Sequence, residues 1–210
     1  KENDSVEELI IGGNKKKFLK DTIKGIFHEQ VLRKLISVTF INAFDLSRAQ
    51  LSATSSQDSI ANVFLSTIFR YSRDRSLTSL TLQYNNIDNA GAIAIAHHLK
   101  TSKLISLNLT QNKIEHEGAK NLLENIQYTQ SLTSLSLASN KIGDDGAIQI
   151  SKYLGRTNLT CLDLSENNIT SKGACILVKL SIKSNLTSLN LGFNDICYVG
   201  ANEIANYLVG

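Results

Sequence analysis

The stretch LTSLSLASNKIGDDGA, residues 132–147, carries the pattern on which the rest of the chain is built. Near copies of it start at four other leucines, and successive starts lie 27 or 28 residues apart. The five starts are Leu77, Leu104, Leu132, Leu159 and Leu186. A period in the twenties is typical of a solenoid, in which a repeat can bury its apolar face only against its neighbours.

Each copy contains two leucines separated by one residue, such as Leu135 and Leu137. Alternate residues of a strand point to opposite faces, so we expect these leucines in the core and Ser134 and Ser136 on an exposed face. An asparagine follows in every copy, where its amide can donate to and accept from the backbone of a tight turn. We therefore expect a buried structural ladder formed by Asn85, Asn112, Asn140, Asn167 and Asn194.

A glycine–alanine pair then opens an apolar run in each copy, as at Gly146 and Ala147. Ala147, Ile150 and Leu154 have the spacing of one helix face. We expect the glycine to let this helix lie close against the strand layer. Residues of preferred N-cap types begin three of the helices, and we expect them to cap those helices. The expected caps are Asn89, Asp144 and Ser171, with His116 and Tyr198 at the same position in the other two copies.

This order of elements predicts an α/β fold, a right-handed solenoid with parallel strands on its concave face and helices on its convex face. The pattern LxxLxLxxNxI, a short loop, Gly-Ala and a helix resembles the ribonuclease-inhibitor-like class of leucine-rich repeats. That class occurs also in innate-immune receptors and in effectors of intracellular bacteria. The resemblance covers residues 77–209 and implies the fold and the binding of other proteins. It does not imply inhibition of ribonucleases, because that inhibitor is cysteine-rich and acidic, whereas this chain has three cysteines and a net charge of +3.

Residues 1–76 depart from the regular pattern. We assign residues 1–34 to an N-terminal capping region with a helix over 15–29, which covers the open end of the solenoid. Residues 15–34 have a local net charge of +5, so binding of this helix to an anionic membrane is an alternative.

Residues 35–76 read as a divergent first repeat, followed by five regular repeats over 77–210. We expect a strand at 37–40, an insertion at 47–59 and a helix from Ile60 to Phe69. Ala43 replaces the ladder asparagine, so the ladder is expected to be missing there. The insertion is a secondary candidate for partner contact, because insertions in repeat proteins map to loops.

The sequence favours a binding protein over an enzyme. Cys161 lies on a predicted strand and the histidines of the repeats lie on predicted helices, so no nucleophile has a base beside it. We expect no metal and no cofactor, because metal-ligand spacings and glycine-rich phosphate motifs are absent. The scattered cysteines favour a reducing compartment, the cytoplasm, or the host cytosol if the protein is a secreted effector. No apolar run approaches the roughly 18 residues of a membrane span.

The expected partner is another protein, bound to the concave strand face. Aromatic side chains dominate interface hot spots, so Tyr84 and Phe193 are the expected anchors. Nucleic acid is not expected there, because the face has no Lys or Arg to neutralise phosphate. Two alternatives stay open: a targeting region of a larger enzyme, and end-to-end self-association through the last repeat. The candidate binding residues are Ser79, Thr81, Tyr84, Asn108, Gln111, Ser136, Ser139, Asp163, Glu166, Asn190 and Phe193.

Overall fold

The computed structural model describes residues 8–12, 37–41, 69 and 77–209 of the chain. In these ranges seven strands form one sheet, in which each strand pairs in parallel with the next in sequence order. The strands are β1 (Glu8–Gly12), β2 (Ser37–Ile41), β3 (Ser79–Thr81), β4 (Ser106–Asn108), β5 (Ser134–Ser136), β6 (Cys161–Asp163) and β7 (Ser188–Asn190).

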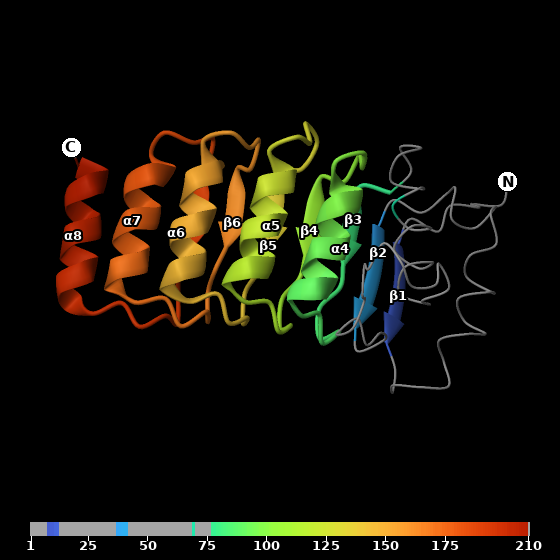
Figure 1. Cartoon of the computed structure of the whole chain (residues 1–210), viewed down its shortest axis with the longest axis horizontal. Coiled ribbons are helices and arrows are strands. Elements are labelled where there is room, and N and C mark those ends of the chain that lie inside the picture. Colours follow the sequence, from blue (N-terminus) through green and yellow to red (C-terminus); the bar gives the residue numbers. More distant parts are fainter. Residues whose placement is uncertain (1–7, 13–36, 42–68, 70–76, 210) are drawn as a thin grey trace, which may run out of the picture.

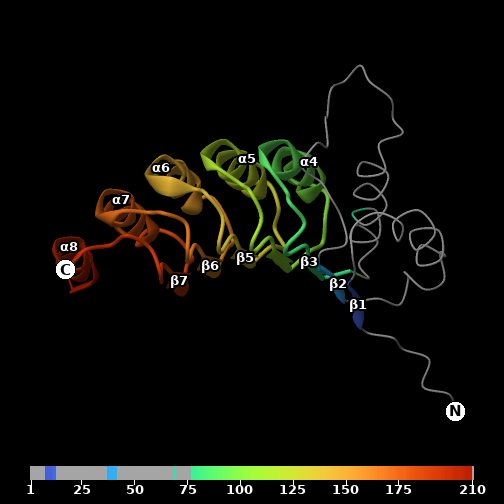
Figure 2. The ribbon, with the colours of Figure 1, turned by 90° about the horizontal axis from the view of Figure 1, so that it is seen from below.

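Five helices alternate with the last five strands. They are α4 (Asn89–Leu99), α5 (His116–Ile126), α6 (Gly143–Leu154), α7 (Ser171–Ser181) and α8 (Tyr198–Val209). The helices stand side by side along one face of the sheet (Figure 1). Seen from below, the strands line the inner side of an arc and the helices its outer side (Figure 2). The predicted solenoid, with strands on the concave face and helices on the convex face, is confirmed.

The sheet begins earlier in the chain than the repeat pattern indicates. Strand β2 confirms the strand predicted at 37–40. Strand β1 pairs with β2 along five residues, in a segment for which no strand was predicted. The register aligns Leu9 with Leu80, and in the sequence Ile11 and Asn14 then correspond to Leu82 and Asn85. The repeat pattern therefore extends to this segment, but isoleucine in place of the second leucine hid the match. The predicted helix at 15–29, Ala43 and the predicted insertion at 47–59 lie outside the described residues.

A continuous apolar core lies between the sheet and the helices. The central leucines of β3 to β6 are at most 1% exposed, and the alanines that follow the repeated glycines are fully buried in α4 to α7. These residues are Leu80, Leu107, Leu135 and Leu162, with Ala92, Ala119, Ala147 and Ala174. Burying one leucine side chain contributes about 1.5–3 kcal/mol, so the stacked repeats stabilise one another. Phe69 is buried as well and stacks on the His98 ring, with centroids 5.3 Å apart.

The helix N-termini are capped one residue earlier than predicted. Asp88 caps α4, since its carboxylate accepts a hydrogen bond from the N–H of Gly91 at 3.0 Å. Thr170 caps α7 in the same way. Helix α6 begins at Gly143 and has no side-chain cap. The prediction that Asn89, Asp144 and Ser171 cap their own helices is therefore wrong.

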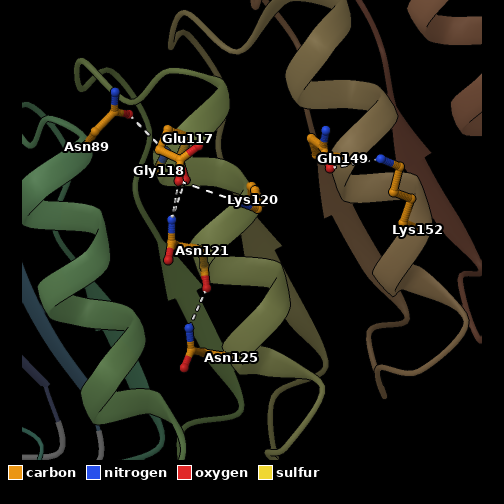
Figure 3. A network of polar contacts seen from close by, with 8 residues as sticks. All are labelled: Asn89, Glu117, Gly118, Lys120, Asn121, Asn125, Gln149 and Lys152. Atoms are coloured by element: carbon orange, nitrogen blue, oxygen red, sulfur yellow. Dashed lines mark hydrogen bonds and ion pairs between the residues drawn. The ribbon is translucent and has the colours of Figure 1, made fainter.

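Those three side chains bond instead to the start of the next helix. The Asn89 Oδ1 accepts hydrogen bonds from the backbone N–H groups of Glu115 and Gly118 at 2.9 and 3.0 Å (Figure 3). The Ser171 Oγ likewise accepts from the N–H of Cys197, directly before α8, at 3.1 Å. One repeat thus satisfies donors that the next helix leaves without an intrahelical partner.

The repeated glycines make room for these cross-repeat bonds. Asp144 Oδ1 accepts from the N–H of Thr170 at 2.8 Å and of Gly173 at 3.2 Å. A Cβ at Gly173 would lie 2.4 Å from that oxygen, and one at Gly118 would lie 2.7 Å from Asn89 Oδ1. The prediction that these glycines approach the strand layer is wrong, since they approach the beginning of the preceding helix.

Candidate functional site

The exposed side chains of β3 to β7 form straight rows across the concave face. The parallel register aligns Thr81, Asn108, Ser136, Asp163 and Asn190 in one row. A second row contains Ser79, Ser106, Ser134, Cys161 and Ser188. All of these side chains are partly or fully exposed, so the predicted binding residues in the strands share one surface. We call these two rows, together with the turn row that follows them, the strand face.

The turn row consists of one residue after each strand, and all five have left-handed backbone conformation. Their φ angles lie between 51° and 61°. The row comprises Tyr84, Gln111, Ser139, Glu166 and Phe193. A residue other than glycine pays roughly 1–2 kcal/mol for this conformation, so the surrounding contacts must enforce it.

Backbone hydrogen bonds between repeats enforce the turn. The N–H of Tyr84 donates to the carbonyl of Thr110, and that of Ser139 donates to the carbonyl of Ser165 at 2.8 Å. The same bond recurs at Gln111 and Glu166. The turns of Tyr84, Gln111, Ser139 and Glu166 are therefore each fixed by the next repeat, and their side chains are held at the rim of the strand face.

Several candidate binding residues also stabilise their own turns. The side-chain oxygens of Asn108, Asp163 and Asn190 each accept a hydrogen bond from the backbone N–H two residues later. The Ser139 hydroxyl donates to Glu166 Oε2 at 2.9 Å, which joins two neighbouring turns. These contacts preorganise the polar part of the strand face.

The two expected aromatic anchors lie at opposite ends of the strand face. Tyr84 follows β3 and is 46% exposed, whereas Phe193 follows β7 and is 90% exposed. Four strand-to-strand steps of roughly 4.8 Å separate them, which gives a span of about 19 Å. The structure does not bring them together, so they can serve only as separate contact points.

The repeated asparagines lie beneath the turns and connect successive repeats. Asn112 Oδ1 accepts from the N–H groups of Asn85 and Ile87 in the preceding repeat, both at 3.0 Å. Its Nδ2 donates back to the carbonyl of Leu82 and to two carbonyls of its own turn. Asn140, Asn167 and Asn194 make the equivalent bonds. Asn85 and Asn167 are fully buried and Asn194 is half-buried, so most of this row has no contact surface for a partner.

Sequence comparison assigns this architecture to a known family. The family profile described as "Leucine Rich repeat" matches residues 73–96, 101–123, 129–151, 156–174 and 183–205, together more than half of the chain. The chain belongs to the leucine-rich repeat family. No curated protein matches it by sequence comparison.

Solved structures of other leucine-rich repeat proteins resemble the chain at low sequence identity. The structure "Leiomodin-1 Actin-Binding Site 2 (ABS2)" has 20% identity and a TM-score of 0.44, and the match covers 78% of this chain and 83% of that one. The structure "Crystal structure of TLR13-ssRNA13 complex" has 18% identity and a TM-score of 0.45. That match covers 91% of this chain and 30% of the other.

Two exposed aromatic residues of this leucine-rich repeat chain escaped the sequence prediction. Tyr198 at the start of α8 is 85% exposed, and Tyr128 after α5 is 62% exposed. Tyr128 lies at the edge where the helices end, away from the strand face. Alignment of the repeats could have revealed it, because Thr101, Arg156 and Lys183 occupy the equivalent position.

The three cysteines of the leucine-rich repeats are free thiols in different surroundings. Cys161 is half-buried in β6, and burial, aided by Glu203, raises the pKa of the Cys175 thiol in α7. Cys197 is exposed before α8, where hydrogen bonds from the Ser171 side chain and from backbone N–H groups lower the pKa of its thiol.

The described ranges contain neither a cluster of metal-binding side chains nor a helix that could span a membrane. Nowhere in them do three His, Cys, Asp or Glu side chains come together in a way that could hold a metal ion. The described helices are also too short or too polar to span a membrane.

Proposed function

We propose that this chain is a protein-binding module that holds its partner against the strand face. Leucine-rich repeats generally serve as protein–protein interaction modules. The observation that carries the proposal is the strand face itself, which runs without interruption across five repeats. The described helices all pack on the other side of the sheet, so they leave this face uncovered (Figure 2).

The dimensions of the strand face support a macromolecular partner. Tyr84 and Phe193 lie about 19 Å apart, because four strand spacings of roughly 4.8 Å separate their turns. A small molecule could not contact both aromatic rings. A protein segment laid across the strands could contact both, with the small polar side chains between them forming hydrogen bonds.

The charge of the strand face supports a protein rather than a nucleic acid. Its three rows contain no Lys or Arg, and Asp163 and Glu166 are its charged residues. Nucleic-acid affinity depends on cations that neutralise phosphates. A neutral or basic protein surface is electrostatically complementary to this face.

We assign no catalytic role to these repeats. Cys161 lies in β6, on the strand side of the sheet, whereas His97 and His116 lie in helices on the other side. A thiol without a neighbouring base is a weak nucleophile, and two acidic side chains engaged in their own turns do not form a general acid–base pair.

The test is affinity capture with two single-position changes at the ends of the strand face. Tyr84→Asn and Phe193→Asn remove the aromatic rings, and asparagine tolerates the left-handed turn better than alanine does. A protein partner captured by the unchanged chain should be confirmed with purified components. Its affinity should fall by about tenfold or more in the double variant, because aromatic anchors dominate interface energy.

The matched control is Tyr128→Ala, which removes an exposed aromatic ring outside the strand face. This variant should keep full affinity for the same partner. The proposal fails if the double variant binds as well as the unchanged chain while both unfold at the same temperature, since the strand face would then not hold the partner.

A further inference from the structure

The helices end along one edge of the solenoid, which carries exposed positive charge. In Figure 1 this is the upper edge of the solenoid, where the C-terminal ends of the helices lie. We define the helix-end edge as residues 100–103, 127–130, 152–158 and 179–185, which are the last turns of α4 to α7 or the loops that follow. Six of its Lys and Arg side chains are exposed, and one of them, Lys103, already interacts within the chain. The other five are Lys100, Lys152, Arg156, Lys179 and Lys183.

These five cations make no ion pair with the described residues. The ion pair found among the described residues joins Lys120 to Glu117 within α5. Lys152 Nζ donates instead to the neutral Gln149 Oε1 at 3.1 Å (Figure 3). Lys100 Nζ lies 5.2 Å from the centre of the exposed Tyr128 ring. The charges at this edge are thus available to an external anion.

The opposite edge, where the helices begin, carries acidic and basic side chains, and two of its carboxylates bond within the chain. Asp88 accepts from an N–H of α4, and Asp144 accepts from two N–H groups at the start of α7. The two edges therefore differ in whether their charged side chains have partners within the chain. The carboxylates of Asp88 and Asp144 have partners within the chain, whereas the five cations named above have no partner of opposite charge among the described residues.

Compensation of the helix dipoles accounts for only part of this charge. The C-terminal end of a helix is equivalent to roughly half a negative charge, so the four helix ends offset about two positive charges. Glu124, in the last turn of α5, offsets about one more. The five cations exceed both contributions, and a positive surplus remains.

An aromatic and two cationic side chains occupy the same position in three consecutive loops. Tyr128, Arg156 and Lys183 each precede a hydroxyl residue that is buried or half-buried. The buried hydroxyl of Thr157 donates to the Leu154 carbonyl at 2.9 Å, which fixes the loop that carries Arg156. Tyrosine and arginine are the residue types enriched in protein interfaces.

From this arrangement we infer that the helix-end edge is a second binding surface, which takes an extended acidic segment of a protein. Neighbouring helices pack about 8–10 Å apart, so cations on successive repeats have that spacing. An extended chain advances about 3.3 Å per residue, so acidic residues at every third position match it. Tyr128 provides an apolar contact beside the charges. This surface is distinct from the strand face and does not depend on the function proposed for it.

The experiment measures fluorescence anisotropy of labelled peptides with the full chain at low ionic strength. One peptide carries glutamate at every third residue, and a second has the same composition with its glutamates contiguous. A single-stranded oligonucleotide and vesicles containing anionic lipid serve as the other probes. The test variant is Arg156→Glu with Lys183→Glu, and the control is Lys113→Glu with Lys141→Glu, which reverses two exposed lysines at the helix-start edge.

We expect the spaced peptide to bind, and to bind more tightly than the contiguous one. The test variant should lose about tenfold or more in affinity, whereas the control variant and the Tyr84→Asn, Phe193→Asn variant should bind normally. Thermal unfolding of each variant shows that the fold is retained. Equal weakening by test and control variants would overturn the inference, because attraction would then be non-specific. Absence of peptide binding, or stronger binding of the oligonucleotide or the vesicles, would overturn the acidic protein segment as the ligand.

Discussion

The carboxylate of Asp144 in α6 accepts a hydrogen bond from the backbone N–H of Gly173 in α7 at 3.2 Å, so one helix start caps the next. A Cβ at Gly173 would lie 2.4 Å from that carboxylate oxygen and 2.9 Å from the Asp144 Cα. The Asp144 backbone cannot move away without disturbing α6. Gly173→Ala should therefore lower the free energy of unfolding by about 1–3 kcal/mol, as overpacking of a tight contact does, and urea denaturation would measure the change.

Gly155→Ala is the matched control for that substitution. Gly155 lies after α6 with a φ of −65°, and the nearest atom to an added Cβ is the Lys183 carbonyl oxygen at 3.7 Å. Alanine fits there without strain, so stability should change by less than about 0.5 kcal/mol. Similar losses at Gly155 and Gly173 would show that close approach is not the reason for the repeated glycine.

The asparagine ladder predicts a large effect for Asn140→Ala. The Asn140 side chain is 5% exposed, accepts from the N–H of Ile114 and donates to three carbonyls, among them Leu109 in the preceding repeat. Alanine would leave these buried groups without partners, at a cost of about 1–3 kcal/mol. Ser134→Ala is the control, because this half-exposed hydroxyl contributes little. Ser136 is unsuitable, since its Oγ lies 2.8 Å from Thr110 Oγ1. Equal urea midpoints for the Asn140 and Ser134 variants would contradict the ladder.

The left-handed turns predict a stabilising substitution at Gln111. Its φ is 53°, and its buried Oε1 has no hydrogen-bond partner. Gln111→Gly removes both the unfavourable backbone conformation and the unsatisfied oxygen, so the free energy of unfolding should rise by about 1 kcal/mol. Gln111→Val should lower it, because a β-branched side chain tolerates positive φ poorly. Thermal unfolding of the two variants measures the difference, and a lower stability for the glycine variant would refute this reading of the turn.

Sequence periodicity predicted those parts of the fold that depend on burial. The leucine, asparagine and alanine positions recur in every repeat because each faces the same core in each repeat. Strand β1 was missed although Leu9, Ile11 and Asn14 correspond to Leu80, Leu82 and Asn85 of the first regular repeat, because isoleucine replaces the second leucine of the pattern. The left-handed turn was not predicted because the Tyr, Gln, Ser, Glu and Phe that occupy it share no chemistry, and four of them are held by a backbone bond to the next repeat that the sequence does not show.

The helix caps show a second limit of reading repeats from sequence. Asn89 is of a preferred N-cap type, and its position at a helix start was read correctly. Its side chain nevertheless bonds to the next helix, while Asp88 caps its own. Alignment of the repeats identifies equivalent positions. It does not show whether a side chain bonds within its own repeat or to the next one. For the same reason the helix-end edge was missed, since its charges gather only when the loops of several repeats are stacked.

The contact between Ser171 and Cys197 predicts selective thiol chemistry. The Ser171 Oγ lies 3.2 Å from Cys197 Sγ, and hydrogen bonds from this hydroxyl and from the N–H groups of Gly200 and Val199 lower the thiol pKa. More thiolate is therefore present near neutral pH, and the thiolate is the reactive species. Iodoacetamide should modify the exposed Cys197 faster than Cys175, whose pKa is raised by burial. Peptide mass spectrometry across a pH series would give both rates.

Substitution of Ser171 separates the hydrogen bond from simple exposure. Ser171→Ala should move the midpoint of Cys197 alkylation to higher pH, because the thiolate loses its strongest hydrogen-bond donor. Ser171→Thr retains a hydroxyl and should leave the midpoint near that of the unchanged chain. If the Ser171→Ala and Ser171→Thr variants have the same pH midpoint of alkylation, solvent exposure alone explains the reactivity of Cys197. If only alanine shifts it, a side chain of one repeat sets the thiol chemistry of the next, by the same cross-repeat contact that caps the helices.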